Sequence, residues 1–91
     1  MNYLKVRWIH SHPGEPVLLY SELDQYRWEK RKVEVFTDGR AGYASATASA
    51  GSTQLGKEPV PPMAKIADDP QFEPLEITRQ EFEDVWARCV K

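Results

Sequence analysis

Apolar and charged positions alternate at the start of the chain. Leu4, Val6 and Trp8 are separated by Lys5 and Arg7, so the apolar side chains share one face of an extended segment. This pattern predicts the first strand of a sheet, with one apolar and one mixed face.

Two turn signals divide the strand-like runs that follow. Pro13-Gly14 precedes the apolar run of residues 16–23, and such a short connection favours an antiparallel hairpin. Asp38-Gly39 lies between residues 32–36 and 40–44, and Asp-Gly in that position is a strong hairpin signal. We therefore expect an antiparallel meander.

The end of the chain carries the signals of an amphipathic helix. Thr78 and Glu81 match a capping box, in which each side chain bonds to the backbone N–H of the other residue. Ile77 and Phe82 flank the cap as a hydrophobic staple does. Apolar residues then recur at helical spacing, at Phe82, Val85, Trp86, Cys89 and Val90. This stripe is expected to pack on one face of the sheet.

The region before this helix is less regular. Residues 45–57 are rich in Ala, Ser, Gly and Thr and predict a flexible loop, whereas residues 62–68 predict a short helix that begins with Pro62. The sequence thus predicts a single α+β domain over residues 1–91. Its architecture is an antiparallel sheet of about four strands (a meander) with the C-terminal amphipathic helix on one face. The expected core is Leu4, Val6, Trp8, Leu18, Val33, Val35, Tyr43, Phe82, Val85 and Trp86.

Composition limits the cellular compartment and the classes of binding partner that we expect for the protein. The 91 residues carry a net charge of −2, and neither half has the basic excess of a dedicated nucleic-acid or membrane-surface binder. The single cysteine, Cys89, excludes an intramolecular disulfide and fits a reducing compartment. Lys5 and Arg7 stand where a secretory signal would need an apolar run. We expect a cytoplasmic protein without a membrane association.

The sequence contains no recognisable set of nucleophile, base and orienting group. Ser11 lies between His10 and His12, but neighbouring side chains of an extended segment point to opposite faces. The two histidines share a side, yet zinc needs a third protein ligand that the spacing does not supply, and hydrogen bonding around the turn is the alternative. We expect no catalysis, no metal, no cofactor and no small-molecule substrate.

Rings and basic residues are interleaved over residues 26–32. Trp, Tyr and Arg are enriched at binding hot spots, so the segment predicts an edge that contacts another protein. Stacking of bases on the rings gives a nucleic-acid alternative, and a core position for Trp28 is a third interpretation. Strand alternation would place Arg27, Glu29, Arg31 and Val33 on one face and Tyr26, Trp28, Lys30, Lys32 and Glu34 on the other.

An acidic patch is expected at Asp68, Asp69, Glu73 and Glu76. Negative charge there would steer the protein to a basic target, mainly through the association rate. The predicted partner-binding residues are Asp24, Tyr26, Arg27, Trp28, Asp68, Asp69 and Glu73.

Three segments carry a resemblance to a known family. They are Tyr3 to His12, Lys32 to Phe36 with Asp38-Gly39-Arg40, and Glu76 to Glu83 with Trp86. On these segments the chain resembles an uncharacterised family of short bacterial proteins that is described only as a domain of unknown function. The resemblance implies a bacterial origin and a self-contained domain, and small domains of this class are often immunity proteins.

These observations lead to one expected function and one alternative. We expect a non-catalytic bacterial protein that binds another protein, most specifically an immunity protein that neutralises a cognate toxin as in a toxin–antitoxin pair. The alternative is a nucleic-acid-associated module that uses residues 26–32.

Overall fold

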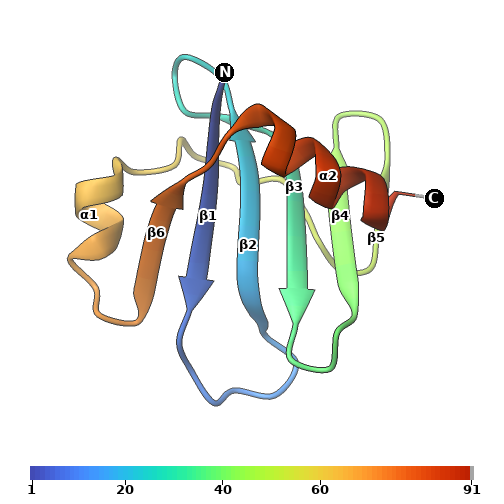
Figure 1. Cartoon of the computed structure of the whole chain (residues 1–91), viewed down its shortest axis with the longest axis horizontal. Coiled ribbons are helices and arrows are strands. Elements are labelled where there is room, and N and C mark those ends of the chain that lie inside the picture. The colour runs from blue at the N-terminus through green and yellow to red at the C-terminus, as the bar shows by residue number, and fades with distance from the viewer. Residues whose placement is uncertain (91) are drawn as a thin grey trace.

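Six antiparallel strands form one sheet, and the two helices lie on opposite sides of it (Figure 1). The computed structural model describes residues 1–90. The strand order across the sheet is β5-β4-β3-β2-β1-β6. The strands are β1 (Asn2–Trp8), β2 (Pro16–Leu23), β3 (Glu29–Phe36), β4 (Ala41–Ser45), β5 (Ser49–Ala50) and β6 (Phe72–Glu76), and the helices are α1 (Met63–Ala67) and α2 (Arg79–Cys89).

The first five strands form the expected meander, because each pairs with the next along the chain. The expected number of about four strands is too low. The sequence pattern misses β5, which has only two residues, and β6, which contains Pro74. Ile77 donates its backbone N–H to the Tyr3 carbonyl, and the Gln71 carbonyl accepts the N–H of Ile9, just after β1. Backbone groups of alternate residues face the same side, so the nitrogen of Pro74 faces away from the sheet. Proline is tolerated there because an edge strand needs no N–H on its outer side.

The helix α2 packs as its apolar stripe predicts, and the expected capping box of Thr78 and Glu81 is present. Phe82 is fully buried against Tyr3, with ring centroids 5.5 Å apart, and Ile77 joins the same cluster. The α2 face is the side of the sheet that carries Tyr3. Within residues 1–90, no helix has the length and apolar character needed to cross a membrane.

The opposite side of the sheet, here called the α1 face, is covered by residues 51–62, which run behind the strands in Figure 1, and by α1, which is drawn to the left of β6. Thr53 is buried against Gly42, and Gly56 donates its backbone N–H to Glu29 Oε1 at 2.6 Å. The loop expected over residues 45–57 thus contains β5 and two contacts that hold it to the sheet.

Burial on both faces changes the expected core. Of the ten predicted core residues, Leu4, Val33 and Phe82 are buried and the others are half-buried. The prediction assigned one apolar face to the first strand, whereas both faces are covered. As a result the neighbours Tyr3 and Leu4 are both buried. The buried apolar residues that were missing from the expected core are Tyr3, Leu23, Ala44 and Ile77.

Candidate functional site

The loop that joins β2 to β3, residues 24–28, is organised by Asp24. Its Oδ1 accepts hydrogen bonds from the backbone N–H groups of Tyr26 at 2.9 Å and Trp28 at 3.0 Å. The backbone of Asp24 also accepts from the Arg27 N–H at 2.9 Å and donates to the Trp28 carbonyl at 3.0 Å. The two bonds to Oδ1, led by that from Trp28, lower the pKa of the Asp24 carboxyl group. The loop is therefore held in one shape by its own residues.

This loop presents two aromatic rings to solvent. Tyr26 is 69% exposed and Trp28 is 41% exposed. Trp28 does not belong to the buried core, which was one of the alternatives for it. A ring held in place before binding loses less freedom on contact than a mobile one, so this geometry suits recognition.

Arg27 connects the loop to a segment far along the chain. It adopts a positive φ of 68°, which is uncommon for a residue other than glycine. Its Nε donates to the Val60 carbonyl and its Nη2 to the Pro61 carbonyl, both at 2.8 Å. The Val60 N–H returns a bond to the Arg27 carbonyl at 2.8 Å. The predicted partner-binding arginine thus holds residues 60–61 against the loop.

The predicted strand alternation is correct from Arg31 onward, where Arg31 and Val33 share one face and Lys32 lies on the other, but it is wrong before Arg31. β3 begins only at Glu29, and the pairing with β2 slips between Glu22 and Leu23, because Lys30 is an extra residue on β3. The bulge turns Glu29 to the α1 face, where its Oε1 lies 3.4 Å from Lys32 Nζ. Arg31 faces α2 instead.

A buried polar network lies beneath α2. Arg31 makes two hydrogen bonds of 2.8 Å to the carboxylate of Glu22, and its Nη2 lies 2.7 Å from Glu83 Oε1. The Tyr3 hydroxyl donates to Glu22 Oε2 at 3.0 Å. The Arg31 guanidinium also lies 4.9 Å from the ring centre of Phe82, a favourable cation–π distance. This network joins β1, β2 and β3 to the helix.

The network shifts the pKa values of its members in directions that the contacts explain. The hydrogen bond to Arg31 lowers the pKa of Glu22, and the same bond raises the pKa of Arg31 further above its ordinary value. Burial, followed by the bond to Glu22, raises the pKa of Tyr3. Each shift favours the protonation state that the network needs at neutral pH.

The predicted partner-binding carboxylates Asp68, Asp69 and Glu73 lie apart from the ring-bearing loop. Asp68 and Asp69 follow α1, and Glu73 lies on β6 with its Oε1 3.7 Å from Arg7 Nη1. In Figure 1 the connection from α1 to β6 is at the lower left, whereas the β2–β3 loop is at the top. The seven predicted partner-binding residues therefore form two separate groups.

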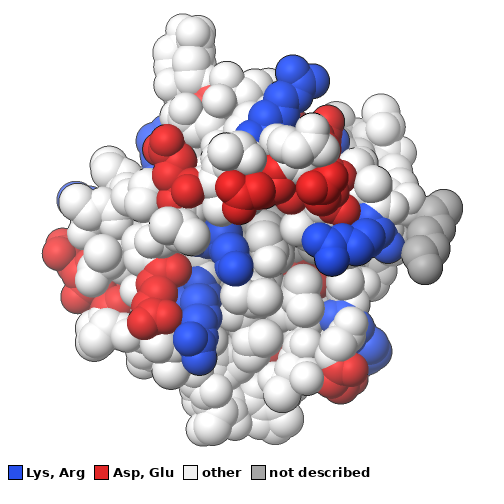
Figure 2. Space-filling model, viewed as in Figure 1, with Lys and Arg blue, Asp and Glu red and all other residues white. Residues whose placement is uncertain are grey.

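Acidic side chains also gather outside the acidic patch that the sequence predicts. Figure 2 shows them grouped over α2, where the sequence places Glu81, Glu83 and Asp84. The part of the sheet below the helix carries fewer charges in the same view. The helical spacing that identified the apolar stripe also implied this opposite, polar side.

His10 and His12 are engaged with the backbone around the first turn. His10 Nδ1 accepts the His12 backbone N–H at 2.9 Å, which leaves the proton on Nε2 to be donated to the Pro16 carbonyl at 2.8 Å. Both ring nitrogens of His10 are thus in use, as the hydrogen-bonding alternative describes. Residues 1–90 contain no cluster of three or more side chains suited to a metal ion.

Two further side chains of a nucleophilic type, Cys89 and Ser21, lie in defined surroundings. Burial raises the pKa of Cys89, which disfavours the thiolate that a catalytic cysteine requires. The Ser21 hydroxyl donates to Glu29 Oε2 at 2.9 Å, and Glu29 Oε1 accepts from Gly56. Sequence spacing gave no signal for this pair, because it depends on the bulge at Lys30.

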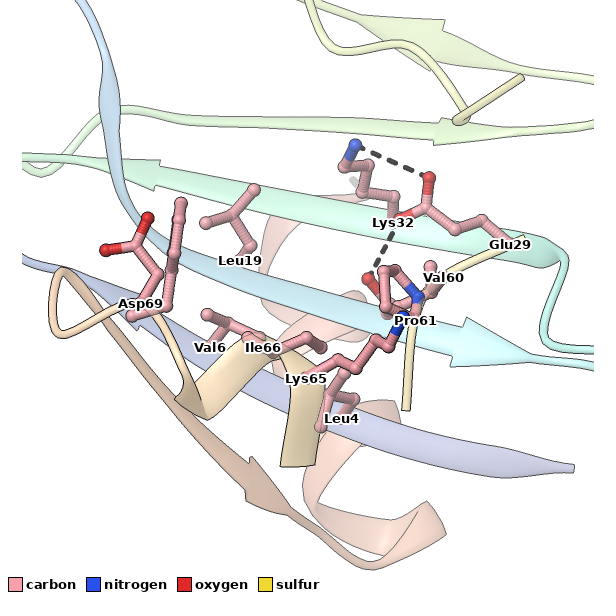
Figure 3. A pocket seen from close by; sticks show the side chains of 12 residues that line it. Leu4, Val6, Leu19, Glu29, Lys32, Val60, Pro61, Lys65, Ile66 and Asp69 are labelled. Atoms are coloured by element: carbon pink, nitrogen blue, oxygen red, sulfur yellow. Dashed lines mark hydrogen bonds and ion pairs between the residues drawn. The ribbon is translucent and has the colours of Figure 1, made fainter. Parts of the chain in front are cut away.

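A trough of about 330 Å³ opens on the α1 face between the sheet and the segment that contains α1 (Figure 3). Leu4, Val6 and Leu19 contribute from the strands, and Ile66 contributes from α1. Figure 3 shows Lys32, Glu29 and Pro61 toward one end and Asp69 toward the other. The sequence did not predict this trough, since it exists only where residues 60–72 return to the sheet.

The family comparison agrees with the resemblance noted in the sequence. A family model described as "Domain of unknown function (DUF6881)" matches residues 2–91. No curated protein and no solved structure matches the chain. Because the match spans nearly every residue, the chain belongs to the DUF6881 family, which confirms the predicted membership of an uncharacterised family.

Proposed function

We propose that this protein acts by binding another protein, and that Tyr26 and Trp28 form the centre of the contact. The observation that carries the proposal is a loop held in shape by Asp24 that exposes both rings. Aromatic residues in well-ordered positions are the side chains that most often dominate binding energies. Order before binding also reduces the entropy lost on association.

The state of the basic residues favours this proposal over the nucleic-acid alternative. A single-strand binder needs basic groups that follow the phosphate backbone beside the stacking rings. Within residues 26–32, Arg27 bonds to the carbonyls of Val60 and Pro61, Arg31 pairs beneath α2, and Lys32 pairs with Glu29. Lys30 is the most exposed of these basic residues, and its ammonium lies 3.7 Å from Asp24. Little free positive charge is left to hold phosphates.

The more specific form of the proposal is an immunity protein in a bacterial cytoplasm that blocks a cognate toxin. Small size and acidic surfaces support it. The acidic groups over α2 and at Asp68 and Asp69 would attract a basic partner, such as a nuclease, and raise its association rate.

The first experiment is capture of partners from a lysate of the native host at moderate salt, using tagged protein. We expect one stoichiometric protein, and replacement of Trp28 by Ala should weaken its binding at least tenfold, as is usual for a hot spot. Leu75→Ala is the matched control, because Leu75 is also exposed, at 57%, but lies on β6. Equal effects of the two substitutions would show that the loop is not the contact.

The immunity form has its own test. Expression of the captured partner alone should kill cells, and co-expression of the intact protein should rescue them. The nucleic-acid alternative predicts instead that single-stranded DNA or RNA is retained and that retention falls steeply as salt rises. If nucleic-acid binding depends on Trp28, and nuclease treatment removes the proteins captured from the lysate, the nucleic-acid alternative would replace the protein-binding proposal.

A further inference from the structure

The trough on the α1 face has an apolar middle and a positively charged end. Its apolar lining comes from Leu4, Val6, Leu19, Val60, Ile66 and Phe72. The volume of about 330 Å³ lies at the lower limit of roughly 300–1,000 Å³ that is usual for small-ligand sites. A few polar groups at one end of such a site normally fix the orientation of the ligand.

Two ammonium groups contribute to the charged end. Lys32 Nζ lies 3.4 Å from Glu29 Oε1 and 3.4 Å from the Gln54 carbonyl, so at least one of its three N–H donors is available. Lys65 on α1 is exposed and makes no ion pair within residues 1–90. In Figure 3 its side chain extends toward Pro61, at the same end of the trough as Lys32.

The Glu29 carboxylate at this end of the trough already has hydrogen-bond and ion-pair partners. Glu29 accepts the Ser21 hydroxyl at 2.9 Å and the Gly56 N–H at 2.6 Å, in addition to its ion pair with Lys32. The local sum of charges over Glu29, Lys32 and Lys65 is therefore one positive charge. Asp69 lies at the other end of the trough, where it would repel a second negative group.

We propose that the trough binds a small monocarboxylate with an apolar body, with the carboxylate near Lys65 and Lys32. The apolar body lies over Leu4, Val6 and Leu19, and the end of the chain points toward Asp69. Neither Tyr26 nor Trp28 lines this trough, so the site does not depend on the protein-binding proposal.

The test uses three probes with the same eight-carbon chain: octanoate, octanol and octylammonium. Each is titrated into ¹⁵N-labelled protein, and amide chemical shifts are followed in two-dimensional NMR spectra. Shifts are expected at Val6, Leu19 and Ile66. Octanoate should bind roughly fivefold more tightly than octanol, the upper end of what a solvent-exposed charge pair contributes, and octylammonium should bind most weakly.

Lys65→Glu is the decisive variant, since α1 has no buried residue whose packing the change would disturb. It should reduce octanoate binding at least to the level of octanol and leave octanol binding unchanged. Lys57→Glu is the matched control, because Lys57 is exposed and does not line the trough. Trp28→Ala should leave octanoate binding intact, which separates this site from the proposed protein contact.

Two results would overturn the proposal. Equal affinities for octanoate and octanol would mean that the trough accepts apolar groups alone, as a side chain of a protein partner would provide. Shifts confined to residues outside the trough, or absent at millimolar probe, would mean that no small carboxylate binds there.

Discussion

The Arg31 network beneath α2 gives the sharpest prediction for stability. Replacement of Arg31 by Met keeps much of the apolar contact with Phe82 and Trp86 but removes every charged bond to Glu22 and Glu83. The Glu22 side chain is only 10% exposed, so its carboxylate would remain largely buried with the Tyr3 hydroxyl as its remaining partner.

The expected cost follows from this uncompensated charge. Removing one partner of a buried ion pair typically costs about 3–5 kcal/mol. The Arg31 side chain is 21% exposed, so water partly replaces it, and we expect about 2–3 kcal/mol of lost unfolding free energy. For a domain of this size that loss lowers Tm by roughly 10–20 °C.

Urea denaturation followed by tryptophan fluorescence measures the effect, and a double-mutant cycle assigns it. Glu22→Gln with Arg31→Met removes both charges, so the double variant should recover part of the loss and give a coupling energy above about 1 kcal/mol. A cost below about 0.5 kcal/mol for Arg31→Met, or additive single effects, would refute the buried network as a source of stability.

The same pair predicts a dependence on pH. The pKa of Glu22 is lowered in the folded state, so its contribution is present above the unfolded value of about 4.3 and is lost as pH falls through the folded value. In Arg31→Met the largest cause of this lowering is absent. The stability difference between the native protein and the variant should therefore shrink as the pH falls below about 4.

Three further predictions concern other parts of the fold. Gly42→Ala places a Cβ against the Thr53 hydroxyl, so thermal denaturation should show a loss of about 1–3 kcal/mol that Thr53→Ala partly restores. Asp24→Ala should lower the protection of the Trp28 amide against hydrogen exchange, because this amide loses its acceptor, and protonation of Asp24 should do the same as pH falls through its lowered pKa; unchanged protection relative to an unstructured amide would contradict this role. Burial raises the pKa of Tyr3, so stability should fall as pH rises above about 10 in the native protein, and a Tyr3→Phe variant with the same alkaline loss would count against this assignment.

Signals that act within a few residues predicted the structure well. The capping box of Thr78 and Glu81 needs only one turn of backbone, and it forms as the sequence indicates. Gly39, in the predicted Asp-Gly hairpin, has a positive φ of 87°. The order of the meander follows from such turns, since each fixes the pairing of the strands on either side.

Signals that assume a regular strand failed where the backbone is irregular. Period-two alternation assigned Glu29 to the face of Arg31, but the extra residue Lys30 reverses it. β6 was missed because Pro74 argues against a strand until the strand is known to lie at an edge. Both errors concern the position of a residue relative to a neighbouring strand. The sequence of one segment alone carries no information about that position.

In the candidate site, the local sequence likewise does not show which charged side chains are paired with distant groups. Along the sequence, Arg27, Arg31 and Lys32 form a basic run beside the rings, and the nucleic-acid alternative rested on that run. Each of the three bonds to a group far along the chain, at Val60, Glu83 and Gln54 respectively. In a domain this small the same side chains must both order the loops and form the surface, so a local count of charges overestimates the field that a partner meets. Within residues 1–90, the side chains of Tyr26 and Trp28 make no such long-range bond, and both stay exposed. The rings, and not the basic residues around them, therefore carry the proposal of protein binding.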